Sequence, residues 1–421
     1  MICGRGKENM RKKLFILLFL VCICGFDYNM VYAAQPTEEW ELPIVPGDEG
    51  VIDKVDSFLC SNATESTFQL QWNKVNNADG YIIEQFKDEK WTRIARIGNG
   101  KTISYKVEGL TSGKKYQFRI KTFMFLGKVP LYSDYVLVSG TTLPTKNTNV
   151  VIGGRATDAL RINWSKNESA AGYIIEQQKD GKWVRIARIA DKNTTTYRVE
   201  KLSAGTSYNF RIMSFNFDGN TAIYSGYVTV KGMTLPMYNN NVVIGGRATD
   251  ALRINWAKNK SASGYIIEQY KGGKWIRIAR IADNNTITYR VEKLSAGTKY
   301  QFRIESFNFD GNIPVYSSYV YINGTTLPIN NRNVVIGGRA TDALRINWTK
   351  NESAAGYIIE QYKDGKWIRI ARIADNNTTT YRVEKLSSGT NYKFRIKSFN
   401  FDGNSAIYSG YVNVSGTTLT K

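Results

Sequence analysis

Short runs of alternating apolar and polar residues fill most of the chain. Leu160, Ile162 and Trp164 alternate with Arg161 and Asn163, and the same alternation continues through residues 173–176, 183–189, 197–200, 208–212 and 224–230. Side chains of a β-strand point alternately to two faces, so a period of two predicts half-buried strands. With an opening strand near Val150, residues 145–236 are expected to form seven antiparallel strands.

Turn residues separate these predicted strands. The segment Lys179 to Lys182, Lys-Asp-Gly-Lys, is expected to form a hairpin turn. Gly153 and Gly154 are interpreted as another turn, because they do not open a helix as the glycines of a phosphate-binding loop would.

A constant spacing of 92 residues relates four copies of this pattern. It holds for three sets of aromatic residues: Trp72, Trp164, Trp256 and Trp348; Trp91, Trp183, Trp275 and Trp367; and Tyr116, Tyr208, Tyr300 and Tyr392. The run NVVIGGRATDALRINW occurs unchanged three times, ending at Trp164, Trp256 and Trp348. Repeat 1 lacks this run and is therefore the divergent copy. The spacing predicts repeats at 53–144, 145–236, 237–328 and 329–421.

The order of the strand sequences LRINW, GYIIEQ, KWVRIARI and TTYRVEKL resembles a fibronectin type III domain. Leu202 and Tyr208, six residues apart, are similar to that family's tyrosine corner, as are the pairs Leu110 and Tyr116, Leu294 and Tyr300, and Leu386 and Tyr392. The resemblance implies that the Tyr hydroxyl bonds back to the chain before the sixth strand. It also implies an all-β protein, with four tandem seven-stranded sandwiches in an elongated array and the Trp72 set in the cores.

The first 33 residues are typical of an export signal: basic residues, an apolar run from Leu14 to Phe26, and then Val31, Tyr32 and Ala33. Lipid attachment at Cys22 or Cys24 is the alternative. The apolar run is too short for a membrane-spanning helix, and no second one follows, so no transmembrane anchor is expected. Residues 34–52 are acidic and are interpreted as a flexible tether.

The charge of the chain favours an anionic partner. The formal net charge is +21, and about +18 remains once the signal is removed. An anionic cell-wall polymer, an acidic glycan or a surface protein is the expected partner, whereas nucleic acid is not expected for an exported chain. Solubility alone is the competing explanation of the charge.

The composition removes most catalytic chemistry. The chain has no His, and Cys60 is the only Cys outside the predicted signal, which excludes His-dependent triads and Cys-rich zinc sites. Glu176, Glu268 and Glu360 recur with Arg211, Arg303 and Arg395, which favours cross-strand ion pairs over a pair of catalytic acids. We therefore expect no catalytic residues, no metal site and no cofactor.

Two repeated segments are candidates for ligand binding. The first is the segment Phe-Asn-Phe-Asp-Gly-Asn, interpreted as a loop between the sixth and seventh strands, whose candidate residues are Phe217, Asp218, Phe309, Asp310, Phe401 and Asp402. Exposed Phe rings could stack on a sugar or enter a partner's groove. The alternative is a turn with one Phe covering the core. The chain contains no Arg-Gly-Asp, so the integrin-type site known in this family is not expected.

The second candidate is a strand that combines one Trp with two Arg residues. It comprises Trp183, Arg185 and Arg188, with the equivalents Trp275, Arg277 and Arg280, and Trp367, Arg369 and Arg372. Arg can bind the carboxylate or phosphate groups of an anionic polysaccharide through two parallel hydrogen bonds. A charged edge strand that prevents aggregation is the competing interpretation.

These patterns together predict a secreted, non-catalytic protein, of bacterial origin, that acts in binding and adhesion or as a spacer. Near-identical copies would multiply a weak affinity. The alternative is an accessory carbohydrate-binding protein for extracellular glycan degradation.

Overall fold

The computed structural model describes residues 51–421. The predicted export signal, residues 1–33, and nearly all of the predicted tether lie outside the described residues.

Eight β-strands make up each repeat. Repeat 1 contains β1 Phe58–Ser61, β2 Phe68–Trp72, β3 Gly80–Lys87, β4 Lys90–Ile97, β5 Ser104–Val107, β6 Lys115–Leu126, β7 Val129–Tyr132 and β8 Val136–Thr141. Repeat 2 contains β9 Val151–Arg155, β10 Leu160–Asn163, β11 Gly172–Lys179, β12 Lys182–Ile189, β13 Thr196–Val199, β14 Ser207–Asp218, β15 Thr221–Tyr224 and β16 Val228–Met233.

Repeats 3 and 4 have the same order of strands. Repeat 3 contains β17 Val243–Arg247, β18 Leu252–Asn255, β19 Gly264–Lys271, β20 Lys274–Ile281, β21 Thr288–Val291, β22 Lys299–Asp310, β23 Ile313–Tyr316 and β24 Val320–Thr325. Repeat 4 contains β25 Val335–Arg339, β26 Leu344–Asn347, β27 Gly356–Lys363, β28 Lys366–Ile373, β29 Thr380–Val383, β30 Asn391–Asp402, β31 Ser405–Tyr408 and β32 Val412–Thr417.

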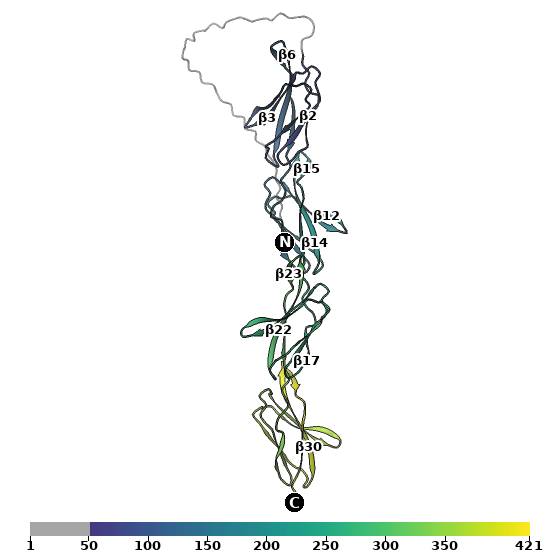
Figure 1. Cartoon of the computed structure of the whole chain (residues 1–421), viewed down its shortest axis with the longest axis vertical. Helices are drawn as coiled ribbons and strands as arrows, with labels where there is room; N and C mark the ends of the chain where they lie inside the picture. The colour runs from purple at the N-terminus through teal and green to yellow at the C-terminus, as the bar shows by residue number, and fades with distance from the viewer. Residues whose placement is uncertain (1–50) are drawn as a thin grey trace, which may run out of the picture. The chain divides into compact units, whose positions relative to one another are not determined.

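Two antiparallel sheets form each sandwich. In repeat 2 the smaller sheet has the order β13-β10-β9, and the larger has the order β12-β11-β14-β15 with β16 also paired to β14. The long strands β6, β14, β22 and β30 can be followed in Figure 1, one in each repeat. The predicted all-β fold of tandem sandwiches is confirmed.

The core of each repeat lies between its two sheets. In repeat 2, Leu160 and Ile162 from β10 pack against Tyr173 and Ile175 from β11, and all four side chains are buried. The Trp164 ring lies 5.2 Å from the Tyr173 ring, and the equivalents Trp72, Trp256 and Trp348 are likewise buried. The period of two therefore places one face of each strand in the core.

A Tyr hydroxyl fixes the turn before the longest strand in each repeat. The Ser203 N–H donates to the Tyr208 hydroxyl at 2.8 Å, and Thr111 and Tyr116, Ser295 and Tyr300, and Ser387 and Tyr392 form the same bond. This is the tyrosine corner that the spacing of Leu and Tyr implied.

Two details of the strand prediction were wrong. Each repeat has eight strands rather than seven, because residues 225–227 interrupt the last predicted strand between β15 and β16. Gly153 and Gly154 lie within β9 and not in a turn. A Cβ atom at Gly153 would lie 1.8 Å from Asn163 Nδ2, so a side chain at this position would displace the Asn163 amide of the neighbouring strand.

Candidate functional site

The Phe-Asn-Phe-Asp segment, predicted as a loop, is part of a β-hairpin. β14 continues to Asp218 and pairs with β15, so only Gly219 and Asn220 form the turn. The loop prediction was therefore wrong, because the alternation of the strand extends through the segment. Phe215 and Phe217 have ring centroids 5.6 Å apart. Phe215 is buried, whereas Phe217 is 41% exposed.

The Asp residues of the hairpin contact the preceding repeat. Asp310 accepts a hydrogen bond from Arg155 Nη2 at 2.8 Å and one from the Met233 N–H at 3.3 Å, both in repeat 2. Asp402 accepts from the Thr325 hydroxyl at 3.0 Å and pairs with Arg247, both in repeat 3.

Asp218 accepts from the Thr141 hydroxyl of repeat 1 at 2.9 Å. The predicted ligand residues Asp218, Asp310 and Asp402 are thus engaged at the junctions between repeats. Their role as ligand contacts is not supported by this placement, since their carboxylates already have partners.

An Asn in the same segment completes each junction and was not among the predicted residues. Asn400 Nδ2 donates to the Gly297 carbonyl of repeat 3 at 2.9 Å and to the Ser353 carbonyl of its own repeat at 3.0 Å. Asn216 and Asn308 form the equivalent pairs of bonds. Repeat 1 has Met124 at this position, and that difference was the signal that could have identified the junction.

Glycine allows the two repeats of each junction to approach closely. A Cβ atom at Gly297 would lie 1.9 Å from the Ser353 carbonyl oxygen of the next repeat. Gly113 and Gly205 are equally close to Ser169 and Ser261. Gly297 also has φ +60, which favours glycine independently of the contact.

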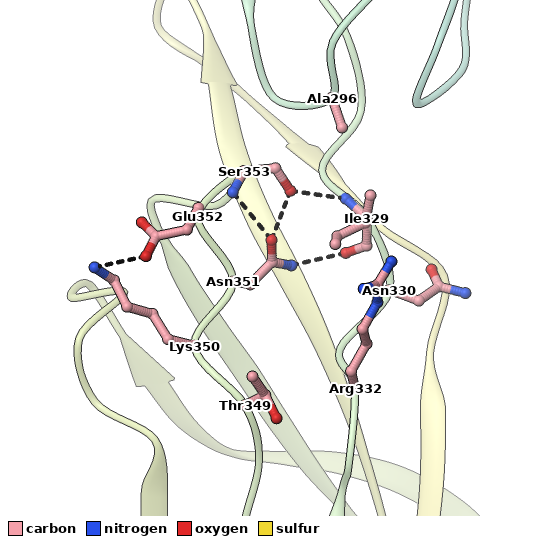
Figure 2. Close-up of a pocket in the computed structure, with 9 residues that line it drawn as sticks. All are labelled: Ala296, Ile329, Asn330, Arg332, Thr349, Lys350, Asn351, Glu352 and Ser353. Carbon is pink, nitrogen blue, oxygen red and sulfur yellow. Dashed lines mark hydrogen bonds and ion pairs between the residues drawn. The ribbon is translucent and has the colours of Figure 1, made fainter.

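A cleft of about 380 Å³ lies at the junction of repeats 3 and 4. Figure 2 shows the hydrogen bonds of two of its side chains: Asn351 Nδ2 donates to the Ile329 carbonyl at 2.8 Å, and the Ser353 hydroxyl donates to Asn351 Oδ1 at 2.6 Å. Lys350 forms an ion pair with Glu352 at 3.0 Å. The side chains of Asn351 and Ser353 thus bond within the junction itself.

The outer face of the larger sheet holds the Trp of the second candidate. The Arg211 guanidinium lies 4.6 Å from the Trp183 ring and 3.7 Å from the Tyr227 ring. Arg211 Nε also donates to Glu176 Oε2 at 2.6 Å. A cation between two aromatic faces is a favourable electrostatic arrangement. Equivalent stacks occur at Trp91, Arg119 and Tyr135; at Trp275, Arg303 and Tyr319; and at Trp367, Arg395 and Tyr411.

The two Arg residues of this strand remain accessible. Arg185 and Arg188 are exposed, and neither forms an ion pair within residues 51–421. The same holds for Arg277 and Arg280 in repeat 3 and for Arg369 and Arg372 in repeat 4. Arg188 lies 4.4 Å from the Phe215 ring, so the structure brings the two predicted segments together on one face. We call this surface, carried by β11, β12, β14 and β16 and their equivalents, the ladder face.

One position at the centre of the ladder face differs strongly between repeats. It is Lys121 in repeat 1, Met213 in repeat 2, Glu305 in repeat 3 and Lys397 in repeat 4. In repeat 4 the ammonium group of Lys397 lies 4.2 Å from the Tyr408 ring. In repeat 3 the equivalent side chain is a carboxylic acid, and burial raises the pKa of this Glu305. Burial, and then the hydrogen bond with Glu305, raise the pKa of Tyr319 to about 12. The ladder face thus keeps its stack of Trp, Arg and Tyr in all four repeats, whereas the charge of the side chain at its centre differs between repeats.

Within residues 51–421 no three metal-binding side chains cluster, and no helix is long and apolar enough to cross a membrane. The family model for the fibronectin type III domain matches residues 53–130, 144–231 and 330–415, which is more than half of the chain. The chain belongs to the fibronectin type III family. Repeat 3 lies outside the matched ranges, but its eight strands follow the same order.

Several curated proteins resemble this chain weakly over long stretches. Protein sidekick-2 of Gallus gallus is 23% identical over 328 residues, covering 70% of this chain and 15% of that protein. Exoglucanase B of Cellulomonas fimi is 20% identical over 359 residues, covering 79% of this chain and 31% of that protein. The chain thus spans less than a third of either relative.

A crystallised pair of fibronectin type III domains from chicken tenascin is also similar, with 19% identity and a TM-score of 0.31. It covers 43% of this chain and all of that one. Fibronectin type III domains are generally non-catalytic.

Proposed function

We propose that this chain is a secreted, non-catalytic adhesion protein that binds an anionic cell-wall polymer or other acidic glycan through its ladder faces. The observation that carries the proposal is the pair of exposed, unpaired Arg residues beside an aromatic stack, as in Arg185, Arg188 and Trp183. Arg211 is neutralised by Glu176, so Arg185 and Arg188 supply the charge that is available to a ligand.

Support for export comes from the order of basic, apolar and small residues in positions 1–33. Support for a non-catalytic role comes from the family and from the paired acids. Glu176, Glu268 and Glu360 each bond to an Arg at 2.6 Å, which holds them as ion-pair partners. The contacts at the junctions add a spacing role, because they give each repeat defined contacts with its neighbour.

An accessory role in extracellular glycan degradation is the second candidate. The similarity to Exoglucanase B of Cellulomonas fimi favours it, since the name of that protein is that of a glycan-degrading enzyme. The two candidates share the ligand chemistry and differ in whether an enzyme acts beside this chain.

Salt dependence tests the proposed binding. The chain from residue 34 onward should bind isolated anionic cell walls at low salt and dissociate above about 0.15 M, where the screening length falls to about 8 Å. Changing Arg185, Arg188 and their equivalents in repeats 3 and 4 to Gln should weaken binding at least tenfold. Salt-insensitive binding would indicate the exposed Phe217, Phe309 and Phe401 instead, and no binding at any salt concentration would leave only the spacing role.

A further inference from the structure

A groove of about 670 Å³ lies at one edge of repeat 3, apart from the junctions. The end of β19, the turn before β22 and the first residues of β22 form its walls. Three exposed Lys side chains line it: Lys271, Lys293 and Lys299. Its one carboxylate, Glu292, is paired with Arg290 at 2.9 Å. The groove is therefore open, polar and positively charged.

An aromatic side chain forms part of the wall. Tyr270 is 43% exposed, and its ring centroid lies 5.2 Å from that of Trp275 on the ladder face. An exposed ring next to several ammonium groups suits a ligand that combines an apolar sugar face with negative charge.

One of the groove's Lys residues has an unfavourable backbone conformation. Lys293 has φ +59, and its equivalents Lys201 and Lys385 have the same value. Repeat 1 has Gly109 at this position, with φ +72, which is the residue that this conformation favours. The conformation recurs in repeats 2 to 4, so it belongs to the backbone frame that their grooves share, and in repeat 3 the Lys293 side chain lines the groove.

The equivalent groove of repeat 4 also combines an aromatic ring with several Lys residues, whereas that of repeat 2 does not. Repeat 4 has Tyr362, Lys363, Lys385 and Lys393 at its groove, so it also combines an aromatic ring with three Lys residues. Repeat 2 has Gln178, Ser207 and Asn209 in the positions of Tyr270, Lys299 and Gln301, and Asn209 Nδ2 donates to Gln178 Oε1 at 2.9 Å. Repeat 2 thus lacks the ring and one of the cations.

We propose that the grooves of repeats 3 and 4 each bind an acidic sugar unit of an anionic polysaccharide, whereas the equivalent groove of repeat 2 does not. The sugar ring stacks on Tyr270 or Tyr362, and the surrounding Lys residues bind its carboxylate or sulfate group. This inference rests on the proposed function and adds to the ladder faces a second contact for the same ligand. Linkage of two grooves in one chain strengthens the binding of a polymer that reaches both.

The test exchanges residues between repeats, so that each substituted residue is one that an equivalent position already accepts. Variant A carries Tyr270→Gln, Lys299→Ser, Tyr362→Gln and Lys393→Asn, which place the residues of repeat 2 at these four positions and remove the ring and one Lys from each groove. The control carries Lys146→Asn and Lys192→Asn, which remove two Lys residues at positions where repeat 4 has Asn. Variant A and the control therefore have the same net charge.

Binding of the chain from residue 34 onward is measured with polygalacturonate, dextran sulfate, neutral dextran and phosphatidylglycerol vesicles. Wild type should bind one or both charged polysaccharides and not neutral dextran. Variant A should bind at least tenfold more weakly, and the control should stay within twofold of wild type. The opposite exchange, Gln178→Tyr with Ser207→Lys, should strengthen binding several-fold. Circular dichroism and urea unfolding establish that each variant is folded.

Equal binding by wild type and variant A would overturn the groove assignment while leaving the proposed function intact. An equal loss in variant A and the control would overturn it too, because net charge alone would then explain the affinity. Binding to vesicles but to neither charged polysaccharide, or binding to none of the probes, would overturn both the groove and the proposed function.

Discussion

The junction between repeats 1 and 2 differs from the two junctions that follow it. In all three, an Asn amide bridges two carbonyl groups, and an Asp of the hairpin contacts the preceding repeat. At the second and third junctions that Asp meets Arg155 or Arg247. At the first, the residue equivalent to Arg155 is Ala63, and Asp218 has the Thr141 hydroxyl as its partner.

The difference shows that the two ends of a repeat vary independently of its core. Repeat 1 keeps the buried Trp72 and the bond between Thr111 and Tyr116, as the other repeats do. Its hairpin, however, has Met124 and Leu126 in place of Asn and Asp. The Asp residues of the predicted ligand segment thus contact the neighbouring repeat, whereas Phe217, Phe309 and Phe401 of the same segment stay partly exposed.

The largest effect is expected from Gly297→Ala. The new Cβ meets the Ser353 carbonyl and the residue keeps an unfavourable φ, so the combined cost is about 3 kcal/mol. Gly389→Ala is the matched control, because Gly389 has φ +63 but its Cβ would meet only a Thr420 methyl group at 3.2 Å. Hydrogen exchange of residues 349–353 should accelerate at least tenfold in the first variant only. Equal exchange in both would show that the contact does not hold the junction together.

Asp310→Ala should cost more than Asp218→Ala. The first loses a charged hydrogen bond, worth about 1.5–3 kcal/mol, and the second a bond to a neutral hydroxyl, worth about 1 kcal/mol. Urea unfolding measures both, and a double-mutant cycle with Arg155→Ala isolates the ion pair. Ala63→Arg should then raise the cost of Asp218→Ala towards that of Asp310→Ala. An unchanged cost would contradict the idea that the missing Arg distinguishes the first junction.

Tyr116→Phe and Tyr208→Phe should destabilise their own repeats equally, by about 1 kcal/mol. Each leaves one backbone N–H, that of Thr111 or Ser203, without its acceptor. Tyr238→Phe, at a 50% exposed residue outside the corner, should have little effect. Calorimetry of the three variants provides the measurement, and unequal losses in the first two would mean that repeat 1 also differs in its core.

The smallest effect concerns Cys60, beside the first junction. Burial, with a smaller contribution from Asp218, raises the pKa of the Cys60 thiol from about 9 to about 12. The thiol of the unfolded chain ionises at a lower pH than the thiol of the folded chain. The free energy of unfolding of repeat 1 should therefore fall as the pH rises from about 9 towards 12. Asp218→Asn should lower this pKa and speed alkylation by iodoacetamide less than tenfold at pH 9. A slower reaction would contradict the assigned influence of Asp218.

The sequence predicted most of what depends on one repeat alone, although it placed Gly153 and Gly154 in a turn and the Phe-Asn-Phe-Asp segment in a loop, and both lie in strands. The 92-residue spacing and the alternation around Trp164 identified the repeats, the core and the corner at Tyr208. The role of Asp310 could not be predicted, because it depends on which surface of repeat 2 meets the hairpin. Likewise, the groove at Tyr270 joins residues from separate strands, and φ at Lys293 leaves no mark in a single sequence. The sequence showed that repeat 1 has Met124 and Leu126 where the other repeats have Asn and Asp. It did not show that this Asn and Asp contact the preceding repeat.

The contact between Asp402 and Thr325 closes a ring in the chain. Thr325 ends β24, the strand that continues through the linker into repeat 4, and Asp402 returns from that repeat to the same residue. Each pair of neighbours is thus held by a covalent link and by several polar contacts, and twisting about the linker requires those contacts to break. Under tension these polar links should release first and re-form when the load is removed. The junctions would then act as a mechanical buffer that yields before any sandwich loses its core.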